Sequence, residues 1–279
     1  QQRANYRMRM FKYVFWSRLV TLILWLFASP AQATNELYIG AGTQLLTLIE
    51  KDRITGKQLV QEQGWMPSAI YGLYWPMERL RLNAHVQQSF GFMPYDGQTQ
   101  TGVPHQSETT HYITQGHASI GFMLAPLTEV YTGFYLQEDV RNVANRNNVY
   151  GATEVYDEVM LRYGIKQTFF ENHHQRLWAW GEWQQALYAR SNADQRVAFD
   201  DTQITLKKGS AYSVGLRYQQ ELTRQQAWFI ESSYYVHQYQ DSSEQRLTSN
   251  GQVTSHYAYQ PPIKFSHVSV YGGLVWTFD

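Results

Sequence analysis

The sequence of 279 residues contains no cysteine, which excludes disulfide bonds, catalytic thiols and thiolate metal sites. Long apolar runs are also scarce. The stretch from Leu19 to Ala28 is shorter than the roughly 20 residues that a membrane-spanning helix requires. Basic residues are not in excess, since Lys and Arg total 23 and Asp and Glu total 23. We therefore expect no nucleic-acid partner.

The apolar run has the setting of a secretory signal peptide rather than of a spanning helix. Arg9, Lys12 and Arg18 precede or open the run, and Ala31-Gln32-Ala33 forms a box of small residues after it. We expect cleavage after Ala33.

This expectation divides the chain into two parts. Met8 or Met10 would be the start, so we interpret residues 1–33 as upstream sequence plus a cleaved signal peptide, and residues 34–279 as one domain. Five basic residues and no acidic residue lie in the first part, so 23 basic residues fall to 18 against 23 acidic ones, and the net charge becomes −5.

Aromatic residues, by contrast, are abundant, at 15% of the chain with 21 tyrosines. Apolar and polar residues alternate with period two in about ten segments, and the connections between these segments are alternately long and polar, and short. A mean hydropathy of −0.47 agrees with such alternation, because half of each strand would face away from lipid. The pattern predicts an all-β, closed, antiparallel, transmembrane up-and-down barrel of ten strands, with eight or twelve as alternatives.

The last segment, residues 265–279, shows the alternation most clearly. Val268, Val270, Gly272, Leu274, Trp276 and Phe278 fall on one face, and the opposite face is small and polar. The positions of Tyr271, Gly273, Trp276 and Phe278 resemble the C-terminal assembly signal of Gram-negative outer-membrane β-barrels. That family usually ends on the aromatic residue, whereas this chain adds Asp279. The resemblance implies an outer-membrane location, contact with outer-membrane lipid and lipopolysaccharide, and a barrel-assembly machinery as partner during biogenesis.

Tryptophans gather beside the short connections and the C-terminus, and Trp and Tyr are favoured where an apolar membrane core meets headgroups. We expect one aromatic girdle on the periplasmic side, with both termini in the periplasm. Its members would be Trp75, Trp178, Trp180, Trp228 and Trp276, together with Phe278.

Charged and imidazole side chains recur on the faces expected to point inward. The predicted lumen-lining residues are Arg81, His85, His117, Glu129, Glu158, Arg162, Lys166, Glu182, Arg217, Glu231 and His237. Small barrels have interiors that side chains fill. We expect a nearly closed lumen held by ion pairs among Arg81, Glu129, Glu158, Arg162, Arg217 and Glu231. A selective pore lining is the alternative.

Catalytic patterns are sparse. His117-Ala118-Ser119 and His267-Val268-Ser269 resemble the H-x-S pair of outer-membrane lipid A deacylases, but they would face the lumen. The adjacent His173 and His174 indicate a solvated turn rather than a metal site.

Ten strands also resemble omptin proteases, which use Asp pairs and an Asp–His pair in external loops. The loop that carries Asp194, Asp200 and Asp201 has no histidine. The preferred interpretation is a non-enzymatic barrel without cofactor or metal, either a narrow plugged channel or a structural and surface-interaction protein, to which a stand-alone autotransporter-type barrel would be related. An enzyme acting on lipid A or peptides and a small-solute porin are the alternatives.

Overall fold

The computed structural model describes residues 35–98, 102–146, 151–172, 174–194 and 199–278. The predicted signal peptide and Asp279 lie outside these ranges, so the predicted processing stays a prediction. Across the described residues, no helix has both the length and the apolar character needed to cross a membrane.

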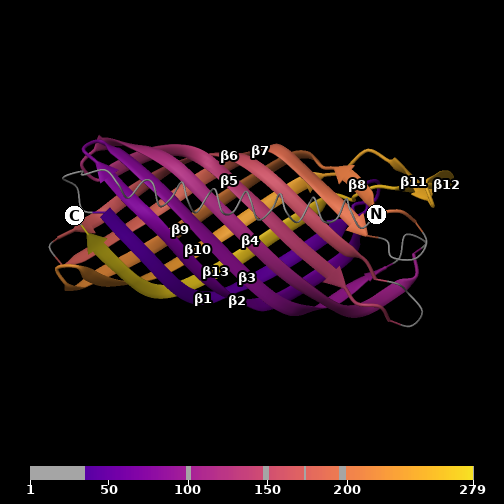
Figure 1. Ribbon diagram of the computed structural model, residues 1–279, viewed down its shortest axis with the longest axis horizontal. Helices are drawn as coiled ribbons and strands as arrows, with labels where there is room; N and C mark the ends of the chain where they lie inside the picture. Colours follow the sequence, from indigo (N-terminus) through magenta and orange to yellow (C-terminus); the bar gives the residue numbers. More distant parts are fainter. Residues whose placement is uncertain (1–34, 99–101, 147–150, 173, 195–198, 279) are drawn as a thin grey trace.

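Within the described ranges, ten long strands form one closed antiparallel barrel, which confirms the predicted architecture and strand number (Figure 1). Each strand pairs with its neighbours along the chain, and pairing of the last strand with the first closes the cylinder. The barrel strands are β1 (Asn35–Lys51), β2 (Gln58–Met77), β3 (Leu80–Gln98), β4 (Pro104–Ala125), β5 (Thr128–Val143), β6 (Thr153–Glu171), β7 (Gln175–Asp194), β9 (Lys207–Thr223), β10 (Gln226–Gln240) and β13 (Ile263–Phe278).

The two ends of the barrel differ. At one end, here the turn end, tight connections join β2 to β3, β4 to β5, β6 to β7 and β9 to β10. The opposite end, here the loop end, carries the longer connections. It also carries β8 (Thr202–Thr205), which extends β7, and a hairpin of β11 (Gln245–Ser249) and β12 (Gln252–Ala258) that projects beyond the barrel (Figure 1). The alternation of long and short connections is thus as predicted.

Burial separates the two faces of each strand. On β13, Val268, Val270 and Leu274 are 40–43% exposed, whereas Tyr271 and Val275 are almost fully buried. The outward residues form an apolar belt of the kind that lipid requires, and the inward residues fill the lumen. The two faces predicted for the last strand are therefore confirmed.

The pairing of β3 with β4 continues toward the loop end beyond the segments that alternate with period two. It reaches as far as Gln98 and Pro104. Near the loop end, polar residues occupy both faces of these strands, so the period-two signal fades although the backbone hydrogen bonds continue.

The β11–β12 hairpin is attached to the barrel through Asp200. Its carboxylate accepts hydrogen bonds from the backbone amides of Asn250 and Gly251, at 3.1 and 2.9 Å. The Gly251 amide is the main reason that the pKa of Asp200 lies below its usual range. Ile204, Leu247 and Ala258 pack beneath this contact and are buried.

We expect Asp200→Ala to loosen the hairpin without affecting the barrel, because the hairpin loses two charge-assisted hydrogen bonds. Limited trypsin digestion of the folded protein should then cleave severalfold faster after Arg246, as local opening governs cleavage of folded segments. Asp201→Ala, at an exposed neighbouring carboxylate, is the control. Equal cleavage rates in the two variants would contradict the role given to Asp200.

Candidate functional site

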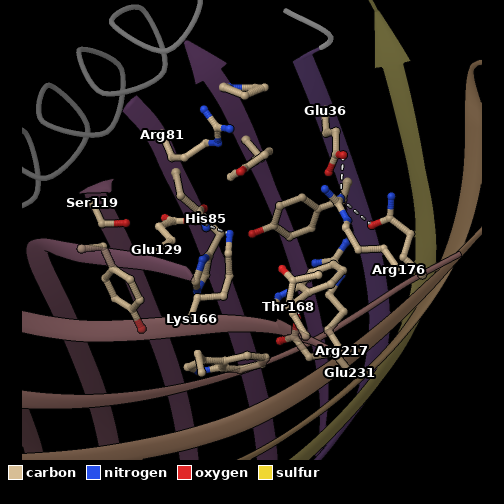
Figure 2. Close-up of a pocket in the computed structure, with 18 of the residues that line it drawn as sticks. Glu36, Arg81, His85, Ser119, Glu129, Lys166, Thr168, Arg176, Arg217 and Glu231 are labelled. Carbon is tan, nitrogen blue, oxygen red and sulfur yellow. Dashed lines mark hydrogen bonds and ion pairs between the residues drawn. The ribbon is translucent and has the colours of Figure 1, made fainter. Parts of the chain in front are cut away.

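A cavity of about 550 Å³ occupies the turn-end half of the lumen (Figure 2). Its lining reaches the turns themselves through Pro126, His174 and Arg224, and it extends inward to His85 and Tyr135. Volumes of roughly 300–1,000 Å³ are typical of ligand sites. This cavity is the candidate site.

Ion pairs dominate the walls of the cavity. Lys166 Nζ lies 2.5 Å from Glu129 Oε2, and Arg176 Nη2 donates a hydrogen bond to Glu36 at 2.7 Å (Figure 2). The lining contains both signs of charge in equal number, with Arg or Lys at 81, 162, 166, 176, 217 and 224 and Glu at 36, 129, 171, 182, 221 and 231.

Deeper in the cavity, Arg217 Nη1 lies 3.4 Å from Glu231, and Arg162 is paired with Glu182. The guanidinium of Arg217 also lies 3.8 Å from the ring centroid of Phe229. Aromatic faces attract cations, so this side chain is held by a carboxylate and a ring together.

Each of the predicted lumen-lining residues faces the interior, but the expected pairing was largely wrong. Of the six residues expected to form ion pairs among themselves, only Arg217 and Glu231 pair with each other within the described residues. Glu158 and His237 lie beyond the cavity, where Glu158 accepts a hydrogen bond from Tyr239 and lies 3.4 Å from His237. Arg81 donates to the backbone carbonyls of Glu78 and Leu80, at 2.6 and 2.9 Å. The predicted lumen-lining residues that line the cavity are Arg81, His85, His117, Glu129, Arg162, Lys166, Glu182, Arg217 and Glu231.

Beyond the cavity, an apolar layer fills the lumen. It draws buried side chains from every barrel strand, and Leu48, Met66 and Met160 are each 0% exposed. Its members are Leu46, Leu48, Val60, Met66, Met93, Ile113, Tyr135, Tyr156, Met160, Ala189, Leu206, Ala211, Tyr235, Tyr239, Ile263 and Phe265. The sequence indicated a polar, ion-paired filling, and this apolar plug is the main feature that it did not reveal.

A sealed cluster of charges adjoins the plug toward the loop end, and sequence reasoning missed it as well. Arg141 Nη1 donates to Glu50 at 2.9 Å and to Glu154 at 2.6 Å, and the same guanidinium binds Glu62. His111 lies between Glu62, at 2.7 Å, and Asp139, at 3.1 Å. The side chains of His111, Glu62 and Arg141 are at most 3% exposed. This cluster, Glu50, Glu62, His111, Asp139, Arg141 and Glu154, is called the sealed cluster below.

The structure confirms the outward direction of some of the predicted girdle tryptophans and contradicts it for others. Trp75, Trp228 and Trp276 lie on strand faces that point outward, as predicted. Trp178 and Trp180 instead line the cavity, so their assignment to the girdle was wrong.

The inward direction of these two indoles follows from the polar residues that share their face of β7. Glu182 and Gln184 lie on the same face of β7 as the two indoles and are buried, whereas Trp183 is 39% exposed on the outer face. Arg176 lies 4.7 Å from the ring of Trp178, which gives that indole a partner in the lumen.

The residues of the predicted assembly signal lie as expected along β13. Tyr271 points inward and is 1% exposed, and Gly273 pairs with Gly40 of β1 at the closing seam. Trp276 and Phe278 share the outward face with Leu274, in register with Leu37 and Asn35. Recognition of this strand during assembly stays a prediction.

The H-x-S patterns face the lumen, as predicted. His117 and Ser119 both line the cavity, and His117 stacks on His85 with ring centroids 4.0 Å apart. His267 lines the same cavity next to Tyr235. His174 is exposed beside Glu221 at 3.6 Å, and His173 lies outside the described residues. In the part of the chain that the structure describes, no group of His, Asp and Glu has an arrangement that would hold a metal ion.

Comparison with known proteins supports the fold. No protein-family model matches the sequence, and neither does any curated protein. Among solved structures, the outer membrane protease OmpT from Escherichia coli superposes with a TM-score of 0.60 and 14% identity, over 88% of this chain and 97% of that one.

Two further solved structures are less similar. The translocator domain of the autotransporter NalP from Neisseria meningitidis gives a TM-score of 0.43 and 9% identity, over 96% of both chains. The β domain of the Bordetella autotransporter BrkA gives 0.39 and 11%, over 86% of this chain and 100% of that one. The similarity to OmpT, together with the closed antiparallel barrel, shows that the chain has the fold of Gram-negative outer-membrane β-barrels.

Proposed function

We propose that this protein is an integral outer-membrane β-barrel that does not conduct solutes and that presents its loop end to the outside. The observation that carries the proposal is the apolar plug, to which every barrel strand contributes and in which Leu48, Met66 and Met160 are fully buried. A solute would have to cross a layer of buried and mostly apolar side chains, and burying an unpaired polar group costs several kcal/mol.

The same proposal places the turn end and both termini in the periplasm. Outer-membrane barrels have short periplasmic turns and longer external loops, and the β11–β12 hairpin extends the loop end (Figure 1). Contact with lipopolysaccharide would then occur around the loop end, and the assembly machinery would meet β13.

Planar-bilayer recording tests the closed lumen. The purified wild-type barrel should insert without steady conductance steps, because the plug leaves no continuous water path. Insertion is verified by labelling a cysteine introduced at the exposed residue Ile54 in the loop between β1 and β2. A large, steady conductance from inserted protein would refute the closed lumen and favour the porin alternative.

An enzymatic function has one observation in its favour, the contact of His111 with Asp139 near the loop end. Omptin proteases also use an Asp–His pair. Here, however, both nitrogens of the imidazole are occupied by carboxylates and the ring is 0% exposed, so it has no route to water or substrate. A general base must reach the proton that it abstracts. The geometry therefore supports a structural role for His111.

A further inference from the structure

We infer that the turn-end cavity is a binding site for a neutral, polyhydroxylated ligand, of the size of a disaccharide, that enters from the turn end. This inference is independent of the proposed closure of the barrel. A ligand needs only the cavity in order to bind, and it does not have to pass the plug. The inference rests on the charge balance of the cavity, on its neutral wall and on its aromatic wall.

Charge balance argues against a charged ligand. The cavity is lined by equal numbers of cationic and carboxylate side chains, and four pairs are already made between them. These pairs are Glu129–Lys166, Glu36–Arg176, Arg162–Glu182 and Arg217–Glu231. The other charges of the lining, Arg81, Arg224, Glu171 and Glu221, lie next to the turns and outside these four pairs. A charged ligand deeper in the cavity would have to separate one of the four pairs and leave a partner uncompensated, which is costly where the charges are shielded from water.

One wall of the cavity consists of neutral hydrogen-bonding groups. Asn83, His85 and Gln87 of β3 lie directly opposite Ser119, His117 and Gln115 of β4 in the strand register, and all six line the cavity. Hydroxyl, amide and neutral imidazole groups can each both donate and accept hydrogen bonds. Sugar hydroxyls have the same dual capacity, so such a wall matches them better than it matches an ion.

Part of this wall lacks protein partners. Asn83 Oδ1 and His117 Nδ1 are buried without a hydrogen bond, and His85 and Ser119 make none with other described residues. Figure 2 shows His85 and Ser119 directed into the cavity beside Glu129. Native proteins rarely leave several polar groups unsatisfied in one place, and a ligand is one of the reasons.

The remaining feature is a set of aromatic faces. Trp178 and Trp180 of β7 line the cavity across the lumen from β3, and Tyr38, Tyr74 and Tyr131 contribute further rings. A cation lies over the rings of Trp178, Tyr38, Tyr74 and Tyr131, so of these five rings that of Trp180 is the one without a cation partner among the described residues. Aromatic faces carry partial negative charge and pack against the polarised C–H groups of a sugar ring. A hydrogen-bonding wall facing aromatic rings thus points to a sugar rather than to a purely apolar molecule.

The test uses the full barrel in an amine-oxide detergent, because glucoside and maltoside headgroups are themselves sugars. Tryptophan fluorescence and saturation-transfer NMR are recorded with the disaccharide of N-acetylglucosamine, with maltose and with glucose 6-phosphate. We expect saturable binding of at least one neutral disaccharide and weaker binding of the phosphate. His85→Ala and Asn83→Ala should each weaken the binding by about tenfold, as expected for a lost buried hydrogen bond.

Gln88→Ala is the matched control, since Gln88 follows Gln87 on β3 but points to the outer face, where it bonds Tyr112. Each variant must still form a folded barrel, which is checked by its faster migration on a gel when the sample is unheated than when it is boiled. Three results would overturn the inference: no saturable binding of either neutral sugar at millimolar concentration, preferential binding of glucose 6-phosphate, or equal weakening by Gln88→Ala. None of them affects the proposed closure, which bilayer recording tests separately.

Discussion

Replacement of Arg141 by alanine is expected to destabilise the barrel by about 3–5 kcal/mol, the usual effect of removing one partner from a buried ion pair. This guanidinium donates to Glu50, Glu62 and Glu154, and its side chain is 3% exposed. Without it, Glu50 and Glu62 would remain buried, and His111 would be the cation that still contacts Glu62. The effect is measured as the shift in the urea concentration at which half of the protein is unfolded. Unfolding is monitored as the loss of the faster migration that the folded barrel shows on gels when the sample is not heated.

Two further variants separate this effect from a general loss of charge. Arg190→Ala removes an arginine from a half-exposed pair with Asp157, at 3.0 Å, and should cost no more than about 1 kcal/mol. Adding Glu50→Gln to Arg141→Ala should restore part of the lost stability, because it removes a buried carboxylate whose ion pair was with Arg141. Equal losses for Arg141→Ala and Arg190→Ala would contradict the sealed cluster as a determinant of stability.

Gly273→Ala is expected to reduce the amount of assembled barrel sharply. Gly273 pairs with Gly40 where β13 closes against β1, and the ring of Phe229 covers both. A Cβ at residue 273 would lie 2.1 Å from the carbonyl oxygen of Ile39 and 2.6 Å from that ring. Backbone of the partner strand cannot yield as a flexible side chain would, and overpacking costs about 1–3 kcal/mol or more.

The neighbouring glycine provides a matched control. A Cβ at Gly272 would point to the lipid face, 3.8 Å from the nearest atom, the carbonyl oxygen of Phe229. Gly272→Ala should therefore leave assembly unchanged. The measurement is the amount of heat-modifiable barrel in the membrane fraction at matched expression. Normal assembly of Gly273→Ala would show that the seam tolerates a methyl group. Equal losses for both variants would show that the clash at residue 273 is not the cause of the loss.

The sequence by itself determined the class of fold, the number of barrel strands and the inward or outward direction of most side chains. Lipid excludes polar groups and a strand alternates its side chains, so the outward row of Val268, Val270 and Leu274 could be read without coordinates. Pairs on adjacent strands were anticipated only in part. Glu231 lies opposite Arg217 and pairs with it, whereas Glu129 pairs with Lys166, which was not among the residues expected to form ion pairs.

Local irregularities in strand pairing limit how far the alternation of side chains predicts which residues face the lumen. The pairing of β6 with β7 shifts between Val159 and Met160, where Leu187 is the additional residue, so the inward parity of β7 changes within the strand. No period-two pattern can be continued through such a bulge. The bulge does not lie between the two tryptophans and Glu182, so the inward direction predicted for Glu182 applies to Trp178 and Trp180 as well, although they were assigned to the girdle.

Only the tertiary structure decided which side chains meet across the lumen. Arg141 of β5 reaches Glu50 of β1 and Glu62 of β2, and Arg176 of β7 reaches Glu36 of β1. These contacts join strands that are not neighbours, so they depend on closure of the cylinder and on its register rather than on any local pattern. The same holds for the plug, because Met66, Met160 and Phe265 are unremarkable inward residues until closure brings them into one layer. Closure is a property of all ten strands together, and no single segment of the sequence encodes it.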